Sequence, residues 1–317
     1  FTPASIINDA PVVFDDPALE STWRPENYSG RFYGPTRLRE ALYRSRNLVS
    51  IRILRTIGAA YAAKYAENFG FSPEQLPRDL TLALGSPSVT PLQLARAYAV
   101  LANGGHLVDP YFIRSVHDAT GEVIFEVDPA VVCPLCRTAT VDGLSGAAAT
   151  PRQAPQVLTP QNTWLMTSMM QDVIQRGTGS KARVLGRTDL AGKTGTTNDQ
   201  KDAWFSGFNR SLVATTWVGF DKLEPLGRGE TGGRAALPVW IDFMREALDG
   251  VPERKLEQPE GLVTVRIDPA TGLLADSGRT DAIFETFQEN SVPVTTSDLL
   301  SPGGATGAGG SAVEQLF

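Results

Sequence analysis

One glycine-containing stretch, residues 190–197, constrains the fold of this 317-residue chain more than any other. It reads Leu-Ala-Gly-Lys-Thr-Gly-Thr-Thr, so an apolar start leads into small polar residues and then into a polar turn at 198–200. Apolar and polar residues alternate over 203–208, and a second run over 211–220 follows a turn at 209–210. Short runs of this kind, separated by tight polar turns, predict three neighbouring antiparallel strands.

Helical patterns surround these strands, with apolar residues spaced by three and four and with proline or glycine at the ends. Helices are expected over 34–44, 48–57, 59–68, 91–103, 160–176 and 238–248. A hairpin over 111–127 and a late strand over 263–267 complete the pattern. The chain is therefore expected to have an α+β fold, in which an antiparallel sheet is flanked by helices.

The domain organisation follows from changes in composition along the chain. Residues 1–34 hold several prolines and are expected to be irregular. We expect one domain over 1–290, in which the Ala-, Pro- and Gly-rich residues 128–158 form a surface insertion. Residues 291–317 become Gly/Ser-rich and are expected to form a flexible C-terminal tail.

Composition excludes several classes of function. The net charge is −6 and there is no basic block, so nucleic acid is not an expected partner. No apolar run is long enough to span a bilayer. Cys133 and Cys136 are expected to form a loop disulfide or to be free thiols, because neither His106 nor His117 is spaced as a further metal ligand. We therefore expect no metal and no cofactor.

Residues 193–196, Lys-Thr-Gly-Thr, carry the first candidate chemistry. At the edge of a strand they present an ammonium group, two hydroxyl groups and a backbone N–H to one side, and Gly195 allows a ligand to approach closely. Such groups suit a small carboxylate next to a carbonyl that becomes an oxyanion. The alternative for an isolated Lys-Thr-Gly is a glycine-rich turn with a surface lysine.

A second motif, Ser45-Arg46-Asn47, is expected in the break between two helices, where it exposes a hydroxyl and a carboxamide. Alone, such a sequence usually caps a helix. The motif indicates a catalytic site only because Lys193-Thr194-Gly195 follows it in the same domain. Penicillin-binding proteins and serine β-lactamases combine these two motifs with a Ser-x-x-Lys nucleophile.

Over residues 1–285 the chain resembles the transpeptidase domain of class A penicillin-binding proteins. Besides the two motifs above, the matching stretches are Pro25-Glu26-Asn27-Tyr28, Gly34-Pro35, Leu38-Arg39-Glu40-Ala41-Leu42, Gly85 through Val89-Thr90-Pro91, Ala97-Tyr98-Ala99, Ala102-Asn103-Gly104-Gly105, Arg176-Gly177-Thr178-Gly179, Ala203-Trp204-Phe205 and Trp217-Val218-Gly219. Many ordered motifs that agree make a more specific match than any single one.

The resemblance implies the fold of penicillin-binding proteins and serine β-lactamases. It also implies a D,D-transpeptidase that cross-links peptidoglycan stem peptides ending in D-Ala-D-Ala through a serine acyl-enzyme, and that β-lactams inhibit. The whole protein would be bifunctional, with an upstream glycosyltransferase domain and a membrane anchor. It would lie in the cytoplasmic (inner) membrane with this domain on the periplasmic side.

The resemblance further implies roles for individual residues. Ser45 would relay a proton to the leaving D-alanine, and Asn47 would bind the peptide backbone of the substrate. Lys193 would keep the site electropositive and hydrogen-bond Ser45. These three residues are the expected catalytic residues.

The substrate-binding residues implied in the same way are Thr194, Gly195, Thr196 and Thr197. The hydroxyls of Thr194 and Thr196 would hold the terminal carboxylate of the substrate. The backbone N–H of Thr196, together with that of the nucleophile, would form the oxyanion hole.

The chain departs from the family pattern in one respect, since no serine is followed by lysine three residues later. The nearest sequence, Thr178-Gly179-Ser180-Lys181, begins with threonine. Because the chain begins with Phe1 and not Met, we expect it to be part of a longer protein. The nucleophile, its helix and two strands of the sheet are then expected on an upstream segment.

Four alternatives remain. A class A β-lactamase would have a Glu-x-x-Leu-Asn stretch, which is missing here, and Arg46 replaces the aspartate of its Ser-Asp-Asn motif. A D,D-carboxypeptidase would use water where a transpeptidase uses an amine. A non-catalytic scaffold would explain the missing nucleophile motif. A Ser-His-Asp hydrolase is disfavoured, since neither histidine has a recognisable catalytic setting.

Overall fold

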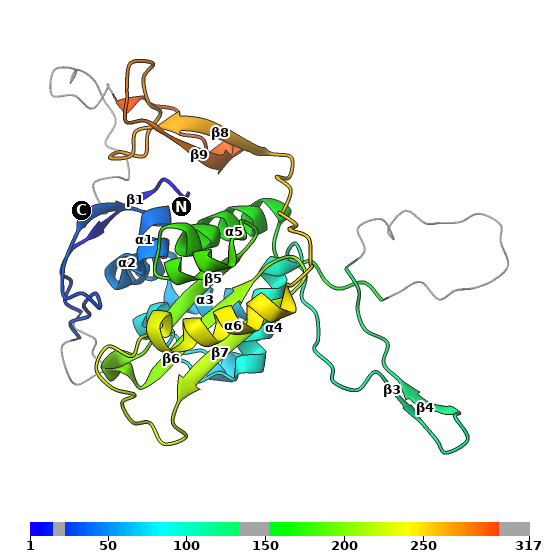
Figure 1. Ribbon diagram of the computed structural model, residues 1–317. Helices are drawn as coiled ribbons and strands as arrows, with labels where there is room; N and C mark the ends of the chain where they lie inside the picture. Colours follow the sequence, from blue (N-terminus) through cyan, green and yellow to red (C-terminus); the bar gives the residue numbers. More distant parts are fainter. Residues whose placement is uncertain (15–22, 133–151, 298–317) are drawn as a thin grey trace, which may run out of the picture.

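The computed structural model describes residues 1–14, 23–132 and 152–297, and Figure 1 shows their arrangement. The helices are α1 (Leu38–Arg44), α2 (Asn47–Ile57), α3 (Ala59–Ala66), α4 (Pro91–Ala102), α5 (Pro160–Gln175) and α6 (Leu237–Ala247). The strands are β1 (Ile6–Asp9), β2 (Gly34–Arg37), β3 (Ser115–His117), β4 (Val123–Glu126), β5 (Ala191–Thr196), β6 (Asp202–Phe208), β7 (Val213–Gly219), β8 (Leu262–Ile267) and β9 (Ile283–Gln288). Within these residues no helix has both the length and the apolar character needed to cross a membrane.

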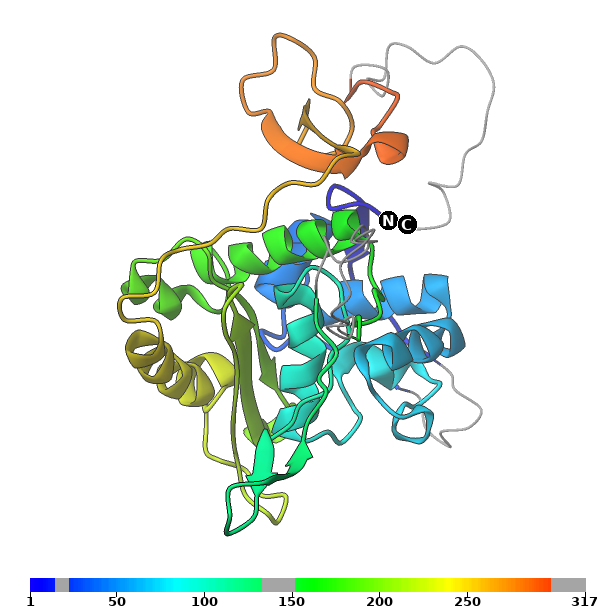
Figure 2. The same ribbon diagram turned by 90° about the vertical axis from the view of Figure 1, so that its right-hand side faces the viewer.

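The central sheet consists of β5, β6 and β7, which are antiparallel and adjacent in that order. Lys193 lies opposite Ser206, and Trp204 lies opposite Trp217. The three strands predicted from 190–220 are therefore confirmed, and so is the α+β class with an antiparallel sheet between helices. Helix α6 covers one face of the sheet and α4 the other (Figures 1 and 2). Helix α5 lies along strand β5 and contributes Ile174 to the cluster on the α6 side and Met170 to the cluster on the α4 side.

The two faces of the sheet bury different clusters of apolar side chains. On the α6 face, the rings of Phe205 and Trp240 meet edge to face with their centroids 4.8 Å apart. A Cβ atom on Gly207 would lie 2.6 Å from Trp240, so only glycine allows α6 to pack this closely. On the other face, Ala191 and Phe208 pack with buried residues of α4 and α5.

Local capping signals fix the starts of α4 and α5. The Thr90 hydroxyl accepts a hydrogen bond from the N–H of Gln93, whose side chain accepts one from the Thr90 N–H. The Thr159 hydroxyl accepts in the same way from the N–H of Asn162. Each cap satisfies N–H groups that lack partners within the helix, and both predicted helix starts are confirmed.

The N-terminal region differs from the sequence prediction. Residues 1–34 were expected to be irregular, but Ile6–Asp9 forms β1 and pairs with β2. The helix expected from residue 34 begins only at Leu38, since Gly34–Arg37 forms β2. Strand β1 buries Ile7 and also Asp9. Because one of the two buried positions carries a carboxylate, the sequence lacks the alternation of apolar and polar residues that marks a strand.

The later chain also holds elements that the sequence did not predict. The strand expected over 263–267 is β8, and it pairs with β9, for which no signal was recognised. Within the flexible tail expected over 291–317, Ser297 is buried and its N–H donates to the carbonyl of Leu274, so the chain is still packed at that residue.

The expected insertion, 128–158, is only partly described, and Cys133 and Cys136 lie outside the described residues. At its end, Ala154 and Leu158 are buried, and Leu158 belongs to the core beside α4 and α5. The domain boundaries themselves remain predictions.

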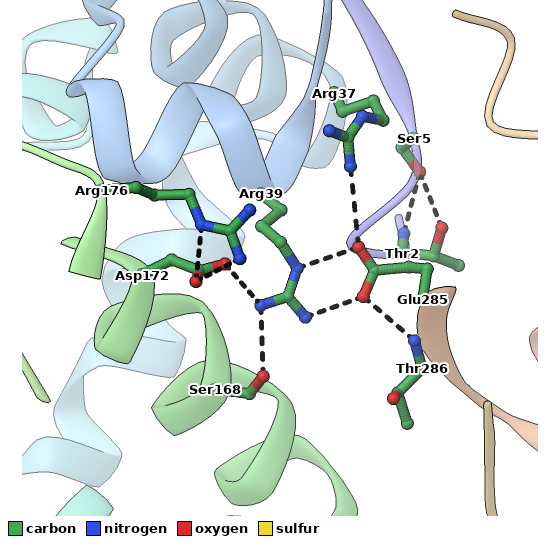
Figure 3. A network of polar contacts seen from close by, with 9 residues as sticks. All are labelled: Thr2, Ser5, Arg37, Arg39, Ser168, Asp172, Arg176, Glu285 and Thr286. Atoms are coloured by element: carbon green, nitrogen blue, oxygen red, sulfur yellow. Dashed lines mark hydrogen bonds and ion pairs between the residues drawn. The ribbon is translucent and has the colours of Figure 1, made fainter. Parts of the chain in front are cut away.

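A buried group of charges joins α1, α5 and β9 (Figure 3). The Arg39 guanidinium donates two hydrogen bonds to Glu285, at 2.9 and 2.7 Å, and one to Asp172 at 3.1 Å. Burial alone would lower the pKa of Arg39, but its bonds and charge contacts with Glu285 and Asp172 raise it. Both carboxylates are almost fully covered. Asp172 also pairs with Arg176 at 2.8 Å, whereas Arg37 lies 3.9 Å from Glu285, so Glu285 is the carboxylate that depends most on Arg39.

We expect Arg39→Ala to lower the free energy of unfolding by about 3–5 kcal/mol, because it leaves two buried carboxylates without their shared cation. The matched control is Arg245→Ala, which removes an exposed pair with Asp242 and is expected to have little effect. Urea unfolding of both variants of the full-length protein measures the difference. Equal stability of the two variants would contradict a central role for the Arg39 cluster.

Candidate active site

The Ser45-Arg46-Asn47 motif occupies the tight connection between α1 and α2, as predicted. Ser45 ends α1 in the left-handed region, with φ 56° and ψ 53°, and its N–H donates to the carbonyl of Leu42. Residues other than glycine seldom adopt such backbone angles, and they cluster at functional sites. The turn brings the Ser45 hydroxyl towards strand β5.

Strand β5 lies at the edge of the central sheet and carries Lys193 on the same face as Ala191, which packs against α4 and Met170 of α5. The Lys193 ammonium donates to Ser45 Oγ at 2.7 Å and to the carbonyl of Thr194 at 3.0 Å. The predicted hydrogen bond between these two motifs, 148 residues apart in sequence, is therefore present.

Lys193 is a cation without a carboxylate partner in the part of the chain that the structure describes. Burial lowers the pKa of its ammonium group to about 8. The group is thus mostly protonated at neutral pH, but it releases its proton more easily than an ordinary lysine.

Asn47 is the first residue of α2. Its Nδ2 donates to the carbonyl of Glu26 at 2.8 Å, and its backbone N–H donates to Asn27 Oδ1 at 2.9 Å. No described residue donates a hydrogen bond to its Oδ1, so this oxygen is free to accept one from a ligand.

The threonines of β5 point their hydroxyls to different partners. Thr194 Oγ1 lies 2.7 Å from Thr178 Oγ1, and Thr196 Oγ1 accepts from the N–H of Gly232 at 3.0 Å. Both threonines line one open cleft, with a volume of about 920 Å³, together with Ser45 and Asn47.

Gly195 and Thr197 are the remaining expected site residues. Gly195, like Lys193, is not part of the cleft wall, and it packs beside Gly232. Thr197 lines the cleft, and its hydroxyl accepts from the N–H groups of Lys201 and Asp202, at 3.1 and 2.8 Å, in the turn that precedes β6.

Several residues of the cleft were not singled out as site residues from the sequence. They are Glu26, Asn27, Tyr28, Ser29, Arg44, Thr178, Lys181, Asn198, Asp199, Gln200, Thr231, Gly233 and Arg234. The whole lining holds four cations, Arg44, Arg46, Lys181 and Arg234, and two carboxylates, Glu26 and Asp199, so positive charge is in excess. Such a cleft attracts an anionic ligand.

Gly232 lies between Thr231 and Gly233 of the cleft wall, and it allows the segment before α6 to pass close to strands β5 and β6. A Cβ atom there would lie 2.2 Å from the Trp204 carbonyl oxygen and 2.3 Å from that of Gly195. The signal that could have identified it is the Thr-Gly-Gly sequence at 231–233, since paired glycines mark close backbone approaches. No group of three His, Cys, Asp or Glu side chains in the described ranges could hold a metal ion.

Comparison with known proteins identifies the family. The profile of the penicillin binding protein transpeptidase domain matches residues 3–225. Penicillin-binding protein 1A of Pseudomonas aeruginosa is 44% identical over 97% of this chain, and the chain spans 41% of that protein. Penicillin-binding protein 1A of Vibrio cholerae is 38% identical over 92% of the chain, which spans 38% of it.

A solved structure agrees with these relatives. The crystal structure of penicillin-binding protein 1A from Haemophilus influenzae superposes with a TM-score of 0.84 at 38% identity, covering 93% of this chain and 46% of that one. A more distant structure, PonA1 from Mycobacterium tuberculosis, shares the fold with a TM-score of 0.64 at 24% identity, over 80% of this chain and 66% of that one. Sequence, fold and site geometry thus agree, and the chain belongs to the transpeptidase domain family of the penicillin-binding proteins.

Proposed function

We propose that this chain belongs to a bifunctional class A penicillin-binding protein and contributes to a serine-type D,D-transpeptidase. Its substrates are peptidoglycan stem peptides that end in D-Ala-D-Ala, and β-lactams inhibit it by acylating the same serine. The observation that carries this proposal is the contact of Lys193 with Ser45 beside a cleft that Asn47 and two threonines of β5 also line.

The nucleophile is a serine of a Ser-x-x-Lys motif on a segment outside residues 1–317. Its hydroxyl attacks the penultimate D-alanine carbonyl, and its proton passes to the lysine of that motif. The bond to the terminal D-alanine then breaks, and the departing amine takes up a proton. The amine of a second stem peptide attacks the resulting ester, which forms the cross-link and frees the serine.

Ser45 delivers the proton to the departing amine. Because the Lys193 ammonium donates to Ser45 Oγ, the hydroxyl hydrogen of Ser45 is free to point into the cleft. The positive charge of Lys193 also attracts the substrate carboxylate. The Asn47 carboxamide hydrogen-bonds the backbone of the stem peptide, since both its Oδ1 and the Nδ2 hydrogen that Glu26 does not use are available.

Thr194 and Thr196 bind the terminal carboxylate. Thr196 Oγ1 already accepts from the Gly232 N–H, so its own hydrogen is free to donate. Thr194 and Thr178 share one hydrogen between their hydroxyls, which leaves one more for the carboxylate. The Thr196 N–H contributes to the oxyanion hole, while Gly195 gives β5 its close packing and Thr197 holds the turn at the cleft wall.

The whole protein is anchored in the cytoplasmic membrane, with this domain in the periplasm and a glycosyltransferase domain upstream. The share of the relatives that the chain spans, 41% for the Pseudomonas aeruginosa protein, supports further segments of this kind. No observation on the described residues favours a carboxypeptidase, a β-lactamase or a scaffold.

We expect Lys193→Ala in the full-length protein to slow acylation by benzylpenicillin at least about a hundredfold, the usual scale for loss of one preorganised electrostatic group. The exposed Lys222 supplies the control, since Lys222→Ala removes the same charge from a loop outside the cleft. Stopped-flow acylation measures both variants. Near-normal acylation by a folded Lys193→Ala protein would refute the assigned role.

The rate of acylation should also fall as pH rises through about 8, because Lys193 then loses its proton. Lys193→Arg, which stays charged, should lack this decrease if it remains active. The pKa of Lys193 is about 8 in the folded chain and 10.5 for an ordinary lysine, so between these pH values the unfolded chain binds more protons. The free energy of unfolding should therefore increase as pH rises from 8 to 10.5. A pH profile of the acylation rate that is identical in both proteins would count against Lys193.

Digestion and mass spectrometry of the penicillin-labelled protein should locate the adduct on a serine outside residues 1–317. Ser45 lacks a lysine one helical turn later, and an unactivated hydroxyl is a poor nucleophile. We expect one penicillin adduct for each protein molecule. An adduct on Ser45 would overturn the mechanism.

A further inference from the structure

The Pro25-Glu26-Asn27-Tyr28 motif has no role in the mechanism above, yet its asparagine contacts the site directly. Asn27 is 4% exposed, and its Oδ1 accepts the hydrogen bond from the backbone N–H of Asn47. Its Nδ2 donates to both carboxylate oxygens of Asp9, at 2.7 and 3.0 Å, and to the carbonyl of Arg31 at 2.9 Å. All of its polar atoms are thus committed.

The contact with Asn47 replaces a missing helix cap. Helix α2 begins at Asn47, and the residue before it, Arg46, makes no side-chain hydrogen bond to the helix. The first N–H groups of a helix have no partner within the helix and need one from outside. Asn27 supplies that partner from 20 residues earlier in the chain.

The same motif also sets the orientation of the Asn47 side chain. Asn47 Nδ2 donates to the carbonyl of Glu26, the residue next to Asn27. A carboxamide has an oxygen on one side and an NH2 group on the other, so a fixed acceptor for Nδ2 determines where Oδ1 points. Two adjacent residues therefore hold both the backbone and the side chain of Asn47.

Arg46, the middle residue of the Ser45-Arg46-Asn47 motif, is held by the same group. Its guanidinium lies 3.2 Å from the ring centroid of Tyr33, and its Nε lies 3.9 Å from an oxygen of Asp9. Asp9 is fully buried in β1 and contacts both Asn27 and Arg46. Through Asp9, Asn27 is therefore also linked to Arg46, in addition to its direct contact with Asn47.

We propose that Asn27 is a positioning residue, which holds the Asn47 carboxamide where it hydrogen-bonds the acylamino group of a substrate or β-lactam. Asn27 acts through Asn47, so it affects compounds that carry an acylamino group more than compounds that lack one. The inference rests on the proposed role of Asn47.

The test compares two inhibitors on full-length protein. Benzylpenicillin has an acylamino group, whereas the carbapenem imipenem carries a hydroxyethyl group in its place. The ratio of their second-order acylation rates does not depend on the fraction of active protein, so partial unfolding leaves it unchanged. Asn47→Ala should lower this ratio roughly tenfold, the scale of one hydrogen bond.

Asn27→Ala should lower the same ratio several-fold, and the double variant should be no lower than Asn47→Ala alone. Residues that act through one another give non-additive effects, whereas independent residues give additive ones. Should Asn27→Ala fail to fold, Asp9→Asn is the second variant. It keeps the shape but puts an NH2 group against Asn27 Nδ2, so it should lower the ratio too.

A matched control separates positioning from stability. Asn209 is 1% exposed, donates to Asp189, and accepts from the N–H groups of Ser211 and Leu212 at the turn between β6 and β7. It is as buried and as fully bonded as Asn27, but it does not line the cleft. Asn209→Ala should lower the Tm without changing the ratio.

The outcomes distinguish this inference from the proposed function. An unchanged ratio in Asn47→Ala would refute the role of Asn47 itself. A lowered ratio in Asn47→Ala with an unchanged ratio in Asn27→Ala, or additive losses in the double variant, would overturn the positioning role of Asn27 and leave the proposed function intact.

Discussion

The geometry of this domain depends on the buried guanidinium of Arg39. It joins α1 to Glu285, 246 residues later in the chain, and to Asp172 on α5. Helix α1 ends at Ser45, and α5 packs against the strand that carries Lys193. The charge cluster in Figure 3 therefore fixes the spacing between the two elements that bring Ser45 and Lys193 together. Glu285 lies outside residues 3–225, the part that the family profile matches. The hairpin of β8 and β9 therefore supplies one of the two carboxylates that bind Arg39.

The second support acts at the other end of the Ser45-Arg46-Asn47 motif. There, Asp9 and Asn27 form a buried polar group that holds the start of α2. One anchor acts on the helix that enters the motif and the other on the helix that leaves it. A catalytic side chain needs this kind of support, because the alignment required for chemistry is finer than that required for folding.

Sequence predicted the parts of the fold that local signals determine. The caps at Thr90 and Thr159 and the alternation over 203–208 act within a few residues, and those elements were correct. Strand β1 was missed because burial of Asp9 depends on Asn27, a partner that lies 18 residues away. Motifs located Ser45 and Lys193, but the role of Asn27 is visible only when its hydrogen bonds are traced through space.

Lys193 connects these supports to the chemistry. The buried carboxylates of the described residues each lie beside an arginine, whereas no described carboxylate pairs with Lys193, and burial lowers its pKa to about 8. A charge held in this way is unfavourable until an anion arrives. A carboxylate bound at Thr194 and Thr196 would favour the ammonium form, and by linkage the ammonium form binds the carboxylate more tightly. Under the proposed function, the burial of Lys193 beside the cleft therefore favours a substrate that carries its own negative charge.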